Sequence, residues 1–233
     1  MNRNGNTYTF LYASIMVIVV AAILSTVAMS LKPMQKRNYE IEKKKSILAS
    51  VNIASTAIDA EQIYAEKILK SYVVDINGNE KEGDAFNTDL KKEMAKDSGE
   101  RVLPVFECQT EEGLKYVFPL RGSGLWGPIW GYVALNEDLN TIYGANFDHE
   151  GETPGLGAEI STEKFEAQFK DNKKIFDAKG NLVSILVSKV GEVAPEEHKV
   201  DGISGGTITS KGLEKMLLDD FTNYKEFLKK KKS

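Results

Sequence analysis

Residues 102–135 have the sequence VLPVFECQTEEGLKYVFPLRGSGLWGPIWGYVAL, and this stretch decides the fold. Apolar, β-branched and aromatic residues concentrate in three short runs, a pattern that predicts strands. These runs are Val102–Phe106, Leu114–Leu120 and Ile129–Leu135. Glycines lie between the last two runs, where a tight turn is expected.

The sequence after this stretch alternates between further strand and helix patterns. The predicted elements are strands at Thr141–Phe147 and Leu182–Val187, a helix at Lys164–Lys170 capped by Ser161, a loop at Val200–Ser210, and an amphipathic helix at Lys211–Leu228. This order of elements predicts an α+β fold with a mainly antiparallel sheet and flanking helices.

An uncharged run precedes the predicted domain. Tyr8–Leu31 (YTFLYASIMVIVVAAILSTVAMSL) contains no charged residue. At about 1.5 Å of rise per residue it is long enough to cross a hydrocarbon core of ~30 Å. The alternative is a cleaved signal peptide with Thr26–Ala28 as the cleavage site, but such peptides carry apolar runs of only about 7–15 residues. The run therefore predicts one N-terminal transmembrane helix.

A polar segment rich in lysine and glutamate connects this span to the domain. Pro33 suits the first turn of a new helix, and Gln35–Val51 is predicted to be a helical stalk. A further helix is expected at Ala60–Tyr72 and an exposed charged stretch at Asn79–Arg101. The predicted organisation is a short tail at 1–7, a transmembrane helix at 8–31, a membrane-proximal stalk at 32–55 and a folded domain at 56–233.

Composition excludes several classes of function. The formal net charge of −4 argues against nucleic acid as a partner, which requires clustered lysine and arginine. Cys108 is the single cysteine, and His149 and His198 lack the spacing of metal ligands, so no metal site is predicted. Any redox chemistry is therefore expected to use an organic cofactor. No G-x-G-x-x-G pattern between a strand and a helix indicates a nicotinamide site.

A glycine-rich loop precedes the C-terminal helix. Residues 201–210 have the sequence DGISGGTITS. Two glycines allow close approach of the backbone to a ligand, and the N–H groups of the following helix favour an anion. Thr207 places a hydroxyl beside that position. The alternative is an ordinary loop in which Thr209 or Ser210 caps the helix.

Two other stretches contain short glycine-rich motifs. Residues 149–157 (HEGETPGLG) contain a Pro-Gly turn, whose alternative interpretation is a turn with an exposed glutamate. Residues 122–127 (GSGLWG) place Trp126 beside a glycine-rich turn. The alternative for Trp126 is a core tryptophan beside a hairpin turn.

These three stretches together resemble the FMN-binding domain of respiratory redox complexes. Residues 201–207 resemble the signature Asp-x-x-(Ser/Thr)-Gly-Ala-Thr, except that Gly206 replaces the usual alanine. In that family a flavin transferase joins FMN from FAD to the last threonine of the signature by a phosphoester, which implies covalent FMN on Thr207. The whole chain resembles the NqrC family of the sodium-translocating NADH:quinone reductase. The nearest alternative is the related flavin-carrying protein of the Rnf ferredoxin:NAD oxidoreductase.

The resemblance implies a function and a set of contacts. The chain would relay electrons within a sodium-pumping complex of six subunits in the bacterial inner membrane, with its domain on the periplasmic side. Lysines after the span (Lys32, Lys36) would favour the opposite orientation, but long domains can be translocated regardless of charge. A membrane-anchored binding module without flavin is the non-enzymatic alternative. Besides Thr207, the implied cofactor contacts are Asp201, Ser204, Gly205, Gly206, Ile208, Thr209, Leu125, Trp126, Glu152, Thr153, Gly155, Leu156 and Gly157.

Overall fold

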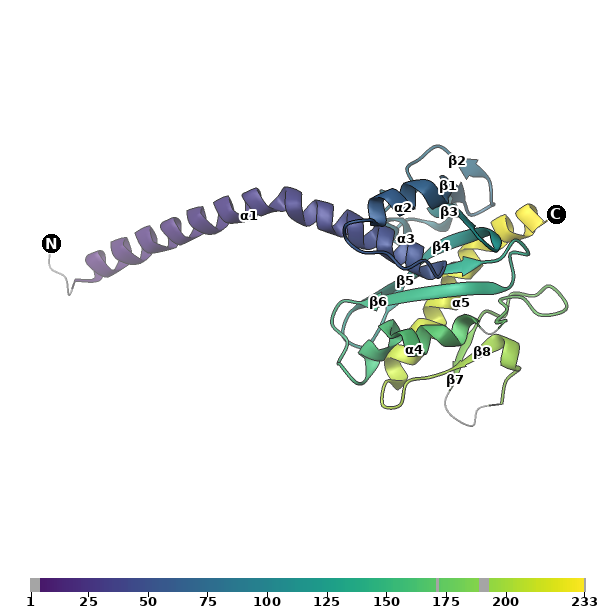
Figure 1. Cartoon of the computed structure of the whole chain (residues 1–233). Coiled ribbons are helices and arrows are strands. Elements are labelled where there is room, and N and C mark those ends of the chain that lie inside the picture. Colours follow the sequence, from purple (N-terminus) through teal and green to yellow (C-terminus); the bar gives the residue numbers. More distant parts are fainter. Residues whose placement is uncertain (1–4, 171, 189–192, 233) are drawn as a thin grey trace. The chain divides into compact units, whose positions relative to one another are not determined.

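The computed structural model describes residues 5–170, 172–188 and 193–232 (Figure 1). The chain divides into two compact units, Met1–Lys43 and Lys44–Ser233. The helices are α1 (Asn6–Ser50), α2 (Ala60–Lys67), α3 (Leu90–Met94), α4 (Glu163–Glu166) and α5 (Thr207–Lys232), with short 3₁₀ turns η1 (Ser98–Glu100), η2 (Gly157–Ser161), η3 (Ala167–Lys170) and η4 (Glu196–His198). The strands are β1 (Ile68–Asp75), β2 (Glu80–Lys81), β3 (Val102–Thr110), β4 (Gly113–Ser123), β5 (Pro128–Leu135), β6 (Ile142–His149), β7 (Leu186–Ser188) and β8 (Lys199–Asp201).

Helix α1 contains the apolar run. Among the described residues it is the one helix long and apolar enough to cross a membrane, with a mean hydropathy of 2.5 over its most apolar window. The prediction that a new helix begins at Pro33 is wrong, because α1 continues through this residue. A proline removes one backbone hydrogen bond from a helix, but good helix formers such as Leu31, Met34 and Gln35 surround it.

A meander of antiparallel strands forms the framework of the second unit. Within the described residues the sheet has six strands in the order β2-β1-β3-β4-β5-β6, and every neighbouring pair is antiparallel. The three predicted strand runs lie in β3, β4 and β5, and the predicted strand at Thr141–Phe147 lies in β6. The predicted α+β class, with a mainly antiparallel sheet and flanking helices, is confirmed.

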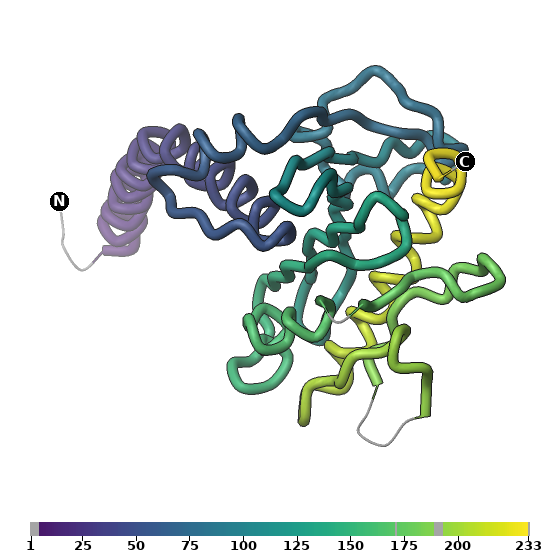
Figure 2. The backbone as a smooth tube through the Cα atoms, turned by 45° about the vertical axis from the view of Figure 1, so that its right-hand side comes forward, coloured from purple at the N-terminus to yellow at the C-terminus, as the bar shows by residue number. Residues whose placement is uncertain are grey.

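Both faces of the sheet are buried, because its strands alternate apolar residues on two sides. One face packs against α5, which crosses the teal strands in Figure 2. Phe118 on β4 lies 4.9 Å from the ring of Tyr224 and 6.1 Å from that of Phe221. The opposite face, which includes Phe106 and Val117, packs against Ile47 and Val51 in a second, smaller cluster.

The predicted helix at Ala60–Tyr72 is wrong in its second half. Helix α2 ends at Lys67, and Ile68 begins β1, which pairs with β3. Pairing with an existing strand outweighs the local helical spacing, since strand preference depends on cross-strand neighbours. The charged stretch Asn79–Arg101 is only partly exposed, as Ala85 and Glu93 are buried.

Two further boundaries differ from the prediction. Thr162, not Ser161, caps the helix, and that helix is α4 followed by the 3₁₀ turn η3. The strand predicted at Leu182–Val187 is reduced to β7, because Ser184 has φ of +59° and interrupts the extended backbone.

Candidate functional site

The glycine-rich loop leads directly into α5, which begins four residues earlier than predicted. Thr207 is the first residue of the helix, and Ser210 N–H donates to the Gly206 carbonyl at 2.9 Å. Thr209 and Ser210 therefore lie inside the first turn, and the interpretation that either caps the helix is wrong. Gly205 has φ of +76°, a conformation that favours glycine.

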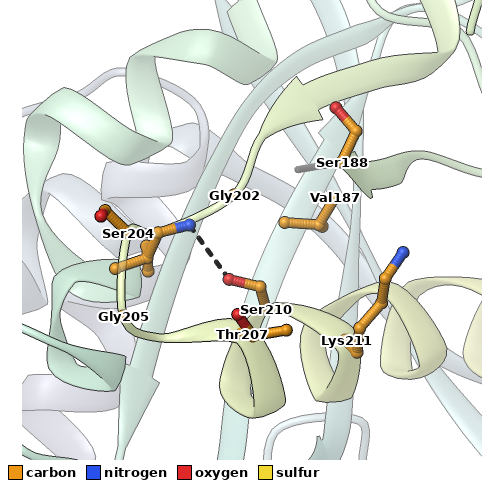
Figure 3. Close-up of a pocket in the computed structure, with 9 residues that line it drawn as sticks. Val187, Ser188, Gly202, Ser204, Gly205, Thr207, Ser210 and Lys211 are labelled. Carbon is orange, nitrogen blue, oxygen red and sulfur yellow. Dashed lines mark hydrogen bonds between the residues drawn. The ribbon is translucent and has the colours of Figure 1, made fainter. Parts of the chain in front are cut away.

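Two hydrogen bonds hold the backbone of this loop, and the dashed line in Figure 3 marks the one that Ser210 Oγ accepts. The Ile203 N–H donates to Ser210 Oγ at 3.1 Å, and the Gly202 N–H donates to the Ser188 carbonyl at 2.7 Å. A small cavity of about 210 Å³ has Thr207 in its lining. Its lining includes Val187, Ser188 and Lys211, which the sequence analysis missed. No motif marks Val187 and Ser188, because only the pairing of β7 with β8 brings them to the loop.

A second cavity of about 400 Å³ also has Thr207 in its lining and gathers all three sequence motifs. It lies between the β4–β5 turn, the loop after β6 and the start of α5. Its lining consists of Leu125, Trp126, Glu152, Thr153, Leu156, Gly157, Gly205, Gly206, Thr207, Ile208 and Thr209. We call this cavity the Thr207 cleft.

The large apolar side chains of the Thr207 cleft are exposed. Trp126 is 69% exposed, Ile208 58%, Leu125 47% and Leu156 41%. The interpretation of Trp126 as a core residue is therefore wrong. Exposed apolar side chains gathered around a hollow are typical of a surface that binds a ligand or a partner.

One charged side chain in the cleft is buried. Glu152 is 4% exposed. Its Oε1 accepts from the Trp126 N–H at 2.8 Å, and its Oε2 accepts from Thr209 Oγ1 at 2.5 Å. Burial raises the pKa of Glu152, but hydrogen bonds from Thr209 and from backbone N–H groups of the β4–β5 turn outweigh it, so the pKa lies below its ordinary value.

The other three predicted contacts are not among the residues that line the Thr207 cleft. Asp201, Ser204 and Gly155 line a neighbouring groove of about 780 Å³. The backbone N–H of Asp201 donates to Gln168 Oε1 at 2.8 Å, which joins β8 to η3. The structure therefore brings eleven of the predicted residues into one cleft and places these three beside it.

Residues 124–219 match the model of the FMN-binding domain family. This range contains β5 and β6 of the six-stranded sheet, the Thr207 cleft and the first half of α5. The class defined by the fold and the cleft is thus a flavin-binding domain.

Similarity to known proteins extends beyond this domain. The NqrC protein of the Na(+)-translocating NADH-quinone reductase of Pseudomonas aeruginosa is 31% identical over 93% of this chain and 91% of its own length. The corresponding protein of Vibrio vulnificus is 32% identical over 84% of this chain and 83% of its own. This chain belongs to the NqrC family of Na(+)-translocating NADH-quinone reductase subunits.

Solved structures of that family share the fold. The crystal structure of the NqrC protein from Parabacteroides distasonis has a TM-score of 0.80 and 46% identity, over 85% of this chain and 96% of the crystallised one. The structure of Shewanella oneidensis NqrC has a TM-score of 0.69 and 27% identity, over 85% of this chain and 99% of that one.

Proposed function

We propose that this chain carries FMN bonded through its phosphate to Thr207, and that it relays electrons within a membrane-bound, Na⁺-translocating NADH:quinone reductase. The observation that supports this most strongly is the Thr207 cleft, in which three separate motifs surround an exposed threonine. The family membership supports the choice of complex.

The residues of the cleft fit a flavin. Its volume of about 400 Å³ lies within the range of small-molecule sites, about 300–1,000 Å³. Trp126 and Leu156 offer aromatic and apolar surface to a planar ring. Thr207 begins a helix of 26 residues, whose first N–H groups and dipole favour a phosphate.

Thr207 would be modified by transfer from FAD. Its Oγ1 attacks the FMN phosphorus of FAD, a new O–P bond forms, the pyrophosphate bond breaks, AMP leaves and the hydroxyl proton is released to solvent. A flavin transferase would catalyse this step. Asp201 and Ser204 lie on the exposed side of the signature loop, where that enzyme could contact them without entering the cleft.

Bound FMN accepts and donates electrons one or two at a time, which suits a relay between other redox centres. The protein would hold the ring between the β4–β5 turn and the loop after β6, and attachment at Thr207 would prevent its loss. The predicted partners are the other five proteins of the complex, and α1 would anchor the chain in the inner membrane.

Flavin fluorescence in a denaturing gel tests the attachment. The full chain is co-expressed with a flavin transferase as wild type, Thr207→Val and Thr222→Val. Thr222 lies on the same helix, and its hydroxyl bonds the Leu218 carbonyl, so this variant controls for the substitution itself. We expect fluorescent bands for wild type and Thr222→Val and a dark band for Thr207→Val. A dark wild-type band, with a transferase active on another substrate, would refute covalent attachment.

Protease accessibility tests the orientation. We propose that the N-terminus lies in the cytoplasm and the domain in the periplasm. Protease added to intact spheroplasts should then remove the domain, and inverted vesicles should protect it. The reverse pattern would place the domain in the cytoplasm.

A further inference from the structure

Glu152 connects the three motifs of the Thr207 cleft through one carboxylate. One oxygen accepts from the backbone of Trp126, 26 residues earlier, and the other accepts from the Thr209 side chain, 57 residues later. The backbone N–H of Glu152 itself donates to His149 Nδ1 at 3.2 Å. A single buried group therefore ties the β4–β5 turn and the loop after β6 to the first turn of α5.

Two glycines make room for this carboxylate. A Cβ atom on Gly124 would lie 2.5 Å from Glu152 Oε1, and one on Gly157 would lie less than 3.0 Å from both Glu152 Oε2 and Thr209 Oγ1. Real Cβ atoms essentially never come this close to another heavy atom. The steric need for glycine at both positions is thus explained by the hydrogen-bonded carboxylate, without any contact to a ligand.

The Trp126 side chain is held in place mainly through the backbone of its turn. With 69% of its surface exposed, the Trp126 side chain is held by little packing. The backbone of its turn is fixed by the bond to Glu152 and by the bond from the Gly124 N–H to the Gly127 carbonyl at 2.8 Å. The position of the indole therefore depends on the carboxylate behind it.

We propose that Glu152 is a positioning residue, which holds Trp126 and the start of α5 in register so that they enclose the flavin ring, without touching the flavin itself. This inference rests on the proposed attachment of FMN to Thr207. The family resemblance implies a direct contact between Glu152 and the flavin. The positioning role differs from this, because both carboxylate oxygens already accept hydrogen bonds from Trp126 and Thr209.

The test compares Glu152→Gln with Glu150→Gln in the flavinylated full chain. Glutamine keeps the size of the side chain but replaces one acceptor oxygen with an NH₂ group. Glu150 lies in the same loop and is exposed, so its variant removes the same charge without the buried bonds. The measurements are the visible circular dichroism and reduction potential of the bound flavin. We expect both to shift in Glu152→Gln and to match wild type in Glu150→Gln.

A second pair of variants keeps the test independent of folding defects in Glu152→Gln. Thr209→Val removes the hydroxyl donor with little change of shape, and Thr209→Ser retains it. We expect Thr209→Val to reproduce the spectral shift and Thr209→Ser to restore the wild-type spectrum. In the unmodified chain, the Trp126 amide should exchange its hydrogen about tenfold faster in Glu152→Gln, because its acceptor changes from a charged carboxylate to a neutral amide.

The outcomes separate this inference from the proposed function. A dark wild-type chain would refute the attachment of FMN, and this inference with it. A flavinylated Glu152→Gln chain whose dichroism and potential equal those of wild type would refute the positioning role alone. A lower melting temperature with an unchanged flavin spectrum would also refute it, since Glu152 would then serve only the fold.

Discussion

Two carboxyl groups are buried at α5, one from the loop after β6 at the start of the helix and one on the middle of the helix itself. Their pKa values are shifted in opposite directions. At the start, Glu152 is 4% exposed and its pKa is lowered, because several hydrogen bonds outweigh its desolvation. In the middle, Asp220 is 2% exposed and burial raises its pKa to about 7, although the Arg121 N–H donates to it at 2.7 Å. Both side chains are nearly inaccessible to solvent, but Asp220 lies deeper in the protein and accepts fewer hydrogen bonds, so desolvation outweighs the donors there and not at Glu152.

The surroundings of the two carboxylates explain the difference. Loop backbone supplies N–H donors to Glu152, whereas α5 beyond its first turns packs on the sheet through aromatic residues such as Phe221 and Tyr224. The same helix thus has an end built for polar recognition and a middle built for stability. Separate mutations should affect these two properties independently.

The largest effect is expected from Phe221→Ala in the middle of the helix. Phe221 is fully buried against Phe118, and removing such a side chain typically costs about 3–5 kcal/mol. Denaturant unfolding of the full chain in detergent measures the loss, with Leu218→Ala, on an exposed position of the same helix, as the control. The remaining folded protein should still accept flavin at Thr207. A loss below about 1 kcal/mol would contradict the assignment of this region as the core.

A smaller and pH-dependent effect is expected from Asp220→Asn. The carboxyl of Asp220 ionises near pH 4 when unfolded and at about pH 7 when folded, so wild-type stability should fall as pH rises between these values and level off above. Asparagine cannot ionise, so the variant does not lose this stability as the pH rises. The variant should therefore be the more stable protein at pH 8, by a few kcal/mol at most, since one pKa unit corresponds to about 1.4 kcal/mol.

The control for Asp220→Asn is Asp97→Asn, an exposed aspartate whose side chain makes no capping bond. Its stability curve against pH should match that of wild type. If Asp220→Asn were less stable than wild type at pH 8, the charge of Asp220 would be stabilising, and the contrast with Glu152 would fail.

The smallest effect is expected at the start of the helix, from Gly206→Ala. A Cβ atom there would lie 2.9 Å from Ile203 Cγ2 and 3.3 Å from the Leu156 carbonyl carbon, so neighbours must move by a few tenths of an ångström. Glycine is also preferred over alanine immediately before a helix. We expect a cost of roughly 1 kcal/mol, measured by denaturant unfolding, with Gly151→Ala as the control because its Cβ would meet open space.

Combining Gly206→Ala with Ile203→Leu sharpens this prediction. Leucine keeps the volume of isoleucine but moves the branch away from Cβ. The double variant should lose less stability than the sum of the single variants. If the stability losses of the two single variants simply added, Ile203 would not be the residue that obstructs the methyl group of an alanine at position 206.

The sequence predicted the elements whose pattern is local and strong. The predicted strand runs in β3, β4 and β5 are rich in apolar residues. Two of these residues, Phe118 and Val133, are buried as expected. The residues of the Thr207 cleft were found through motifs, because each motif is a short contiguous stretch. Whether they contact a flavin stays a prediction.

Features that depend on distant segments were missed. The pairing of Ile68 with Cys108 turned a predicted helix into a strand. Glu152 is an ordinary glutamate in sequence, and its burial depends on Gly124 and Thr209, which only the fold brings together. Ser184 carries no signal for a left-handed backbone, since such a conformation is rare for serine.

The position of α5 along the chain has a consequence for biogenesis. The proposed acceptor Thr207 belongs to the helix that follows every strand of the sheet, and that helix also supplies Phe221, Tyr224 and Leu228 to the core. A ribosome must therefore release α5 before the sheet can bury the apolar face that packs against this helix. The proposed maturation would then follow a fixed order, in which the sheet and α5 fold before Thr207 is presented in its native setting. A misfolded chain would lack that setting, so the location of the proposed acceptor would restrict flavin attachment to folded chains.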